Sequence, residues 1–195
     1  NVGYMDRRIR AGYPEMPPMV GFAATATHRS AAPARAGDTY AGTDQQVESF
    51  ATLSGPAVVV FQDLDEPPAA ANFGEVMCTT YKTYGAVGLI TSGAGRDAEQ
   101  VRAINFPVFT DGWICAHGYT QIPQIQVPVH VGGITIFPDD LLHGDLNGVT
   151  TIPKDIAVEM VDIADEFVDA EHFVLDALAE GPDPKRVAEG RAEMG

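Results

Sequence analysis

The sequence predicts one α/β domain, spanning residues 1–195, that ends in a long amphipathic helix. Apolar segments of strand length alternate with short helical patterns between residues 19 and 110, which is typical of strands and helices packed around a sheet. Turn residues are frequent, with 20 Gly and 14 Pro, which excludes a helical bundle. The length of 195 residues fits one domain, and a hydrophobic content of 45% is enough for a sizeable core.

The elements expected in the first part of the chain are short. Residues 1–36 are expected to be irregular apart from a strand at 19–27, because four prolines interrupt them. A continuous apolar run at 57–62 predicts a strand buried on both faces. The other expected elements up to residue 109 are a helix at 44–53, an acidic loop at 63–68, a helix at 74–84, a strand at 86–91, a helix at 97–104 and a strand at 107–109.

The second part of the chain predicts three strands and one long helix. The strands are expected at 127–131, 134–137 and 149–152, the last two bracketing an acidic turn from Asp139 to Asp145. From Ile156 to Leu178 apolar residues recur every three or four positions, which predicts an amphipathic helix within 153–181. We expect this helix to pack at a subunit interface.

The charge of the chain excludes two classes of partner. A formal net charge of −15 argues against nucleic acid, because phosphate binding needs clustered Lys and Arg, and against an anionic membrane surface. No apolar run approaches the ~20 residues needed to span a bilayer, and no signal peptide is recognisable. A cytoplasmic protein is expected, although the chain starts at Asn1 and a preceding segment is left open.

Cysteine and histidine give no metal signature. Cys78 and Cys115 cannot form a disulfide framework or a thiolate zinc site, and their apolar surroundings predict core positions. His28 and His172 lie in polar surroundings and are expected at the surface. The other three histidines, which also lack the spacing of zinc ligands, are His117, His130 and His143.

Candidate chemistry concentrates in an acid at the start of one predicted helix and an Arg-Asp pair at the start of another. Glu75 opens the first helix, so the amides of Val76 and Met77 are candidate donors to a substrate carboxylate. Arg96 offers a planar fork suited to a carboxylate. Asp97 and Glu75 are hard oxygen ligands of the kind that Mg²⁺ or Mn²⁺ prefers. A 2-keto acid chelating that metal would have its carbonyl polarised.

A structural interpretation fits the same residues. Glu75 and Asp97 can be helix N-terminal charges, and Arg96 can form a surface ion pair. Spacing alone favours this interpretation. The glycines Gly93 and Gly95 do not change it, because the segment lacks both the third glycine of a dinucleotide fingerprint and the Lys-Ser/Thr of a P-loop.

Several ordered motifs resemble the RraA-like family, over almost the whole chain. The hallmark of that family is an acid followed after twenty residues by Arg-Asp, here Glu75 and Arg96-Asp97. The family contains class II pyruvate aldolases acting on 4-hydroxy-4-methyl-2-oxoglutarate and 4-carboxy-4-hydroxy-2-oxoadipate, and regulators that bind ribonuclease E. The further similar segments are 5–9, 20–23, 106–109, 131–134, 138–141 and 145–149.

The resemblance implies a fold, an activity and an assembly of identical subunits. The implied fold is a compact swivelling β/β/α-type layered domain with the C-terminal helix. The implied activity is a metal-dependent lyase that cleaves a 4-hydroxy-2-keto acid to pyruvate, with oxaloacetate decarboxylation as a natural side activity. The implied assembly is a homotrimer or hexamer with sites at subunit interfaces.

The resemblance also implies a role for each site residue. Arg96 would bind the pyruvyl group, with Gly74 and the amides of Val76 and Met77 at the substrate carboxylate. The implied ligands of Mg²⁺ or Mn²⁺ are Asp97 directly, Glu75 through a water, and Glu171 from the C-terminal helix of an adjacent subunit.

Two alternatives stay open at this point. One is a non-catalytic regulator that binds a ribonuclease, although such regulators lack the acid after the arginine and Asp97 counts against it. The other is a degenerate member with a weak cation site, because the family usually has Asp where Glu75 stands. One extra methylene changes the reach of that carboxylate.

Overall fold

The computed structural model describes residues 3–34, 42–179, 181 and 184–194. Contacts divide the chain into two compact units, Asn1–Ile152 and Pro153–Gly195. The first unit carries the sheets and the second carries helices. Each unit is described below by itself.

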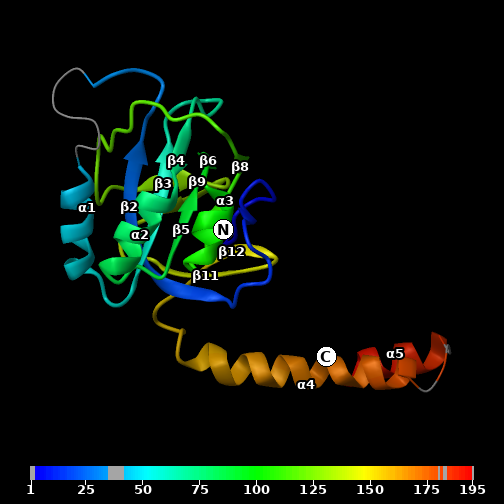
Figure 1. The fold of residues 1–195 in the computed structure, drawn as a ribbon. Coiled ribbons are helices and arrows are strands. Elements are labelled where there is room, and N and C mark those ends of the chain that lie inside the picture. Colours follow the sequence, from blue (N-terminus) through cyan, green and yellow to red (C-terminus); the bar gives the residue numbers. More distant parts are fainter. Residues whose placement is uncertain (1–2, 35–41, 180, 182–183, 195) are drawn as a thin grey trace. The chain divides into compact units, whose positions relative to one another are not determined.

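A seven-stranded sheet forms the centre of the first unit, in the order β1-β7-β5-β3-β2-β11-β12. The central strands β2, β3, β5 and β7 are parallel, so their carboxyl ends lie at one edge of the sheet (Figure 1). The bounds are β1 Arg10–Ala11, β2 Met19–His28, β3 Ala57–Asp63, β5 Gly88–Thr91, β7 Val108–Thr110, β11 Leu141–Asp145 and β12 Gly148–Ile152.

Both faces of this sheet are covered, which explains the unbroken apolar run in β3. Ala57, Val59 and Phe61 face one apolar core, and the alternate residues Val58 and Val60 face a second. The first core is closed by α1 (Thr43–Ser49) and its continuation η1 (Phe50–Thr52), α2 (Glu75–Thr83) and α3 (Ala98–Ala103). The second is closed by the hairpin of β9 (Val129–Val131) and β10 (Ile134–Ile136).

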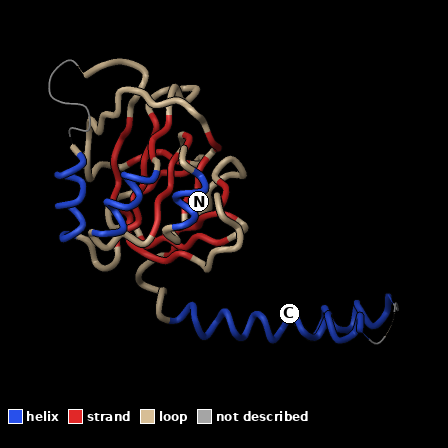
Figure 2. Tube along the Cα trace, in the orientation of Figure 1, coloured by secondary structure: helices blue, strands red, loops and turns tan. Residues whose placement is uncertain are grey.

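The layers are therefore helices, main sheet and hairpin, which confirms the mixed α/β fold of the predicted β/β/α type (Figure 2). A small parallel sheet adds to this arrangement, in the order β4-β6-β8. Its strands are Ala71–Phe73, Ala94–Gly95 and Gly112–Trp113. Strands β6 and β8 follow β5 and β7 within two or three residues, so the small sheet continues the carboxyl edge of the main one.

The second unit is a pair of helices, α4 (Glu159–Ala179) and α5 (Pro184–Met194). The predicted long helix is confirmed as α4, whereas α5 was not predicted. Gly190 of α5 is buried against α4, where an added Cβ would lie 2.7 Å from the carbonyl oxygen of Phe173. The missing side chain lets the two backbones approach closely. Packing of α4 at a subunit interface stays a prediction.

Two expectations are wrong. The acidic turn expected between 139 and 145 contains β11, which pairs with β2 and buries Leu142 and Gly144 on alternate positions. Cys78 is buried as predicted, but Cys115 is exposed. Within the described ranges, no helix combines the length and apolarity needed to cross a bilayer.

Candidate functional site

The register of the small sheet brings the predicted site residues together. Phe73 of β4 pairs in parallel with Gly95 of β6, and the Arg96 amide donates to the Phe73 carbonyl oxygen at 3.0 Å. The chain therefore leaves both strands side by side, at Gly74 and at Arg96. The twenty residues between Glu75 and Arg96 form the rest of α2, then β5 and β6 with their connections.

Asp97 places its carboxylate at the N-terminus of α2. Its Oδ2 accepts a hydrogen bond from the Glu75 amide at 3.1 Å and lies 3.7 Å from Nε of Arg96. A negative charge is stabilised there by the helix dipole. Asp97 itself precedes α3 in the left-handed region, with φ 58° and ψ 43°, a conformation that Asp and Asn tolerate better than most side chains. Sequence reasoning missed this use of the Glu75 amide.

Two glycines make this approach possible. A Cβ on Gly74 would lie 2.6 Å from Oδ2 of Asp97, and a Cβ on Gly95 would lie 2.0 Å from Cζ of Phe73. Neither contact can be accommodated without movement. The glycines therefore act here by leaving space, and Gly74 keeps the Asp97 carboxylate in reach of the helix amide.

Arg96 and Asp97 line an open hollow, whereas the other groups expected to bind substrate, Gly74 and the amides of Val76 and Met77, lie at the start of α2. Arg96 and Asp97 expose 38% and 32% of their side chains, so both reach solvent while held in place. The first helical hydrogen bond of α2 runs from the Cys78 amide to the Gly74 carbonyl oxygen at 3.0 Å. The amides of Val76 and Met77 lie before it, in the turn where helix amides have no partner within the helix.

The hollow has a volume of about 390 Å³. Trp113 forms part of its wall and contacts the rings of Tyr13 and Phe73 at centroid distances of 5.8 Å. Cys115 lines the same hollow, so the apolar residues around it in the sequence belong to the wall of this hollow and do not place Cys115 in the core. The complete lining is Gly95, Arg96, Asp97, Ala98, Trp113, Ile114 and Cys115.

Asp97 and Glu75 are the two acids of the first unit that the sequence predicts as ligands of a hydrated divalent cation, and this stays a prediction. Mg²⁺ is commonly bound through one or two carboxylates with several waters retained; Glu75 is the first residue of α2, and Asp97 immediately precedes α3. Among the residues that the structure describes, no three His, Cys, Asp or Glu side chains form a group that could hold a metal. Glu171 lies exposed on α4 in the second unit, so its part in the site stays a prediction.

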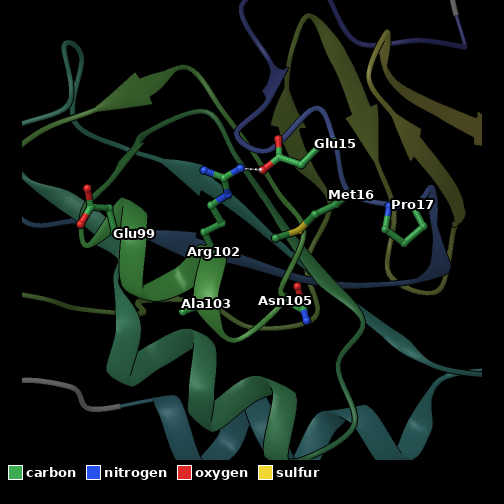
Figure 3. A pocket seen from close by; sticks show the side chains of 7 residues that line it. All are labelled: Glu15, Met16, Pro17, Glu99, Arg102, Ala103 and Asn105. Atoms are coloured by element: carbon green, nitrogen blue, oxygen red, sulfur yellow. Dashed lines mark ion pairs between the residues drawn. The ribbon is translucent and has the colours of Figure 1, made fainter.

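A second hollow, of about 440 Å³, is lined by Glu99, Arg102 and Ala103 of α3 and by the segment from Glu15 to Pro17 (Figure 3). There Nη2 of Arg102 forms an ion pair with Oε1 of Glu15 at 2.6 Å. Both arginines are thus paired with an acid, Arg102 with Glu15 and Arg96 with Asp97, whose closest atoms are 3.7 Å apart.

His28 was expected at the surface, and this is wrong. It ends β2, is fully buried, and lies 2.6 Å through Nδ1 from Nδ2 of Asn72. Burial lowers the pKa of the ring to about 4. The signal was present in the strand period, because His28 continues the alternation of Ala24 and Ala26, which face the first core.

The buried ring predicts acid destabilisation. The pKa of His28 is about 4 in the folded chain against an ordinary 6.5, so the unfolded chain binds the extra proton between these pH values. Stability is unaffected above pH 6.5 and falls as the pH decreases below it, by about 2 kcal/mol between pH 7.5 and pH 5. Urea unfolding at both pH values should show this loss in the wild type and a smaller one in His28→Gln. Replacement of the exposed His130, in His130→Gln, should leave the wild-type loss unchanged. The same loss of unfolding free energy between the two pH values in all three proteins would contradict its assignment to His28.

The fold and the site define a layered α/β protein that presents an arginine and two acids at the start of two helices. A family model for RraA-like proteins, described as Aldolase/RraA, matches residues 2–151. The chain belongs to this RraA-like family, which includes aldolases.

Two named relatives are similar to part of this chain. A protein of Halalkalibacterium halodurans, named "Putative 4-hydroxy-4-methyl-2-oxoglutarate aldolase", is 37% identical over 123 residues, which cover 63% of this chain and 59% of that protein. Protein DlpA of Legionella pneumophila is 32% identical over 111 residues, which cover 56% of this chain and 18% of that protein. The chain thus matches about three fifths of the first relative and less than a fifth of the second.

Solved structures share the fold. An uncharacterized protein from Pseudomonas syringae has a TM-score of 0.73 at 25% identity, covering 98% of this chain and 86% of that one. RraAS2 of Streptomyces coelicolor, described as an unusual member of the RNase ES inhibitor RraA protein family, has a TM-score of 0.70 at 23% identity, covering 88% and 82%. These likenesses establish the architecture and carry no information about the activity.

Proposed function

We propose that the protein is a divalent-metal-dependent pyruvate aldolase, a lyase that cleaves a 4-hydroxy-2-keto acid and releases pyruvate. One observation carries the proposal: the paired ends of β4 and β6 bring Arg96 and Asp97 to the start of α2, beside Glu75. The name of the Halalkalibacterium relative supports the aldolase class.

The proposed roles follow from the position of each group. Arg96 binds the carboxylate and keto oxygens of the pyruvyl end, and the amides of Val76 and Met77 donate to that carboxylate beside Gly74. Asp97 and Glu75 hold Mg²⁺ or Mn²⁺ together with waters. The bound cation supplies Lewis acidity at the keto oxygen.

The reaction then proceeds through an enolate. A base takes the proton of the C4 hydroxyl, C4 becomes a carbonyl carbon, and the C3–C4 bond breaks with its electron pair moving toward the keto group. The negative charge develops on the keto oxygen, where the Arg96 guanidinium stabilises it. Protonation at C3 gives pyruvate. Oxaloacetate loses CO₂ through the same enolate, which makes its decarboxylation a side activity.

A coupled assay of pyruvate release tests the proposal. The panel contains several 4-hydroxy-2-keto acids and oxaloacetate, each with Mg²⁺, with Mn²⁺ and with a chelator. Pyruvate release that requires the cation is expected for at least one of the 4-hydroxy-2-keto acids. No release from any substrate, or release that chelation leaves unchanged, would contradict it. Inhibition of a ribonuclease that survives removal of the Asp97 charge would instead favour the regulator.

We also propose that the site is completed by Glu171 from a neighbouring subunit of a homotrimer or hexamer. Large apolar side chains on α4 are exposed in the single chain, among them Val161, Phe167 and Leu175, each more than 50% exposed. An apolar helix surface of this extent is a candidate interface. Glu171→Lys would replace a proposed metal ligand with a positively charged side chain. Asp176 is exposed on the same helix, so Asp176→Lys is the matched control.

Mixing inactive variants tests this sharing of the site. Asp97→Asn and Glu171→Lys are each expected to be inactive alone. After subunit exchange in an equal mixture, some sites take Asp97 from a Glu171→Lys chain and Glu171 from a neighbouring Asp97→Asn chain. About a quarter of the sites then contain both wild-type acids and should be active. Asp176→Lys should stay active alone. Full activity of Glu171→Lys alone would remove Glu171 from the site without affecting the roles of Arg96 and Asp97.

A further inference from the structure

A buried polar network lies at the carboxyl edge of the sheets, directly before the site residues in the chain. It consists of His28 at the end of β2, Asp63 at the end of β3, Asn72 on β4 and Thr91 at the end of β5. His28, Asn72 and Thr91 are fully buried. Asn72 stands two residues before Gly74, and no role in the proposed reaction uses it.

The donors and acceptors of this network have one consistent arrangement. The Gly93 amide donates to Oγ1 of Thr91 at 2.9 Å, so the Thr91 hydroxyl is free to donate its own proton to Oδ1 of Asn72, at 2.7 Å. The Asn72 amide takes this orientation because the Asp63 carboxylate at its other end only accepts, whereas the Thr91 hydroxyl alone could accept or donate. Nδ2 of Asn72 then faces Nδ1 of His28 at 2.6 Å and Oδ2 of Asp63 at 3.2 Å.

The orientation of Asn72 fixes the tautomer of His28. Because an amide nitrogen only donates, Nδ1 of the neutral His28 ring must accept, and the ring proton lies on Nε2. This Nε2 is buried without a hydrogen-bond partner among the described residues. The ring therefore depends on Asn72 for its polar contact.

The network also contacts the glycine segment that leads to Arg96. A Cβ on Gly93 would lie 1.7 Å from Oδ1 of Asn72 and 2.5 Å from Oδ2 of Asp63. The backbone at Gly93 is thus packed directly on the Asn72 amide. Two residues further on, β6 pairs with β4 and carries Arg96 and Asp97 out of the sheet.

We propose that Asn72 is a positioning residue: by donating to His28 and Asp63 while accepting from Thr91, it holds β4 against the Gly93 segment. This contact sets the placement of the Asp97 carboxylate on the Glu75 amide. Its effect on catalysis rests on the proposed function, whereas its effects on the His28 tautomer and on the Glu75 amide do not.

Two measurements on the unliganded chain test this without any assay of activity. Long-range ¹⁵N spectra of the wild type at pH 7 should show His28 unprotonated at Nδ1 and protonated at Nε2. Asn72→Asp, which has the shape of Asn but only accepts, should move a proton to Nδ1. Hydrogen exchange of the Glu75 amide should become about tenfold faster in this variant, while the amide of Val59 in the core stays protected. The exposed Asn147→Asp is the matched control and should change neither signal.

Each outcome decides the proposal. A wild-type His28 protonated at Nδ1, or an unchanged Glu75 exchange rate in a folded Asn72→Asp, overturns it. If Asn72→Asp does not fold, Thr91→Val takes its place, because it removes the hydroxyl between Asn72 and Gly93. Thr91→Ser, which keeps the hydroxyl, should then restore slow exchange at Glu75, and failure to restore it also overturns the proposal. If the chain proves active, kcat/KM should fall by about 10- to 100-fold in Asn72→Asp.

Discussion

Replacing Asp97 with asparagine is expected to lower kcat/KM for cation-dependent pyruvate release by about 10³-fold. The substitution keeps the size of the side chain and removes the charge that the proposed cation requires. Asparagine tolerates the left-handed backbone at φ 58°, so the loss cannot come from backbone strain, as it could with alanine. Arg96→Ala is expected to lose as much, because the positive charge beside the substrate disappears.

Glu99→Gln is the matched control for Asp97→Asn. Glu99 is an exposed acid in the first turn of α3, the helix that Asp97 precedes. The control therefore removes one charge close to the site and leaves the carboxylates of Asp97 and Glu75 in place. It should keep activity within about twofold of wild type. Isothermal titration with Mg²⁺ should show binding to Glu99→Gln and none to Asp97→Asn. Asp97→Asn with activity close to wild type would remove the aldolase proposal.

Gly95→Ala is expected to destabilise the first unit by about 2–3 kcal/mol and to remove activity. The added methyl would lie 2.0 Å from Cζ of Phe73, a ring that is buried in the first core and cannot move outward. Because Gly95 immediately precedes Arg96, any shift of β6 also displaces the guanidinium. Urea unfolding followed by circular dichroism measures the loss of stability.

Two further variants isolate the cause in Gly95→Ala. Phe73→Leu in the same chain should recover part of the stability, because a shorter side chain vacates the position of Cζ. Gly3→Ala should be close to neutral, since its Cβ would meet only Oγ1 of Thr151 in β12, at an ordinary contact distance of 3.5 Å. A Gly95→Ala chain as stable as Gly3→Ala would show that β6 and β4 are not packed as described.

The sequence predicted those parts of the fold that have a long apolar period. The strand at 57–62 was found because burial on both faces leaves an unbroken apolar run, and the helix at 156–178 because its apolar residues recur every three or four positions. The small sheet was missed because strands of two or three residues, such as β6 and β8, contain no period at all. β11 was missed because only Leu142 and Gly144 face inward.

The candidate site was predictable in part for a related reason. Spacing alone favoured a structural interpretation of Arg96 and Asp97, and the resemblance of the surrounding motifs to a family singled them out; the structure places them at the start of α2. Their chemical roles stay predictions. Asn72 gave no such signal, because it is buried by tertiary hydrogen bonds that leave no pattern in the sequence, whereas the burial of His28 was indicated only by the strand alternation that it continues.

The parallel pairing of β4 with β6 has a consequence for how this protein can vary. The separation of Glu75 from Arg96 in space is set by one backbone hydrogen bond between neighbouring strands, and the chain between them only has to return to the same edge. Extra residues at the exposed turn around Tyr84 and Gly85 would lengthen the connection without moving either end. Relatives with a different count between the acid and the Arg-Asp pair can therefore keep the same site, and strand pairing identifies them where a fixed spacing does not.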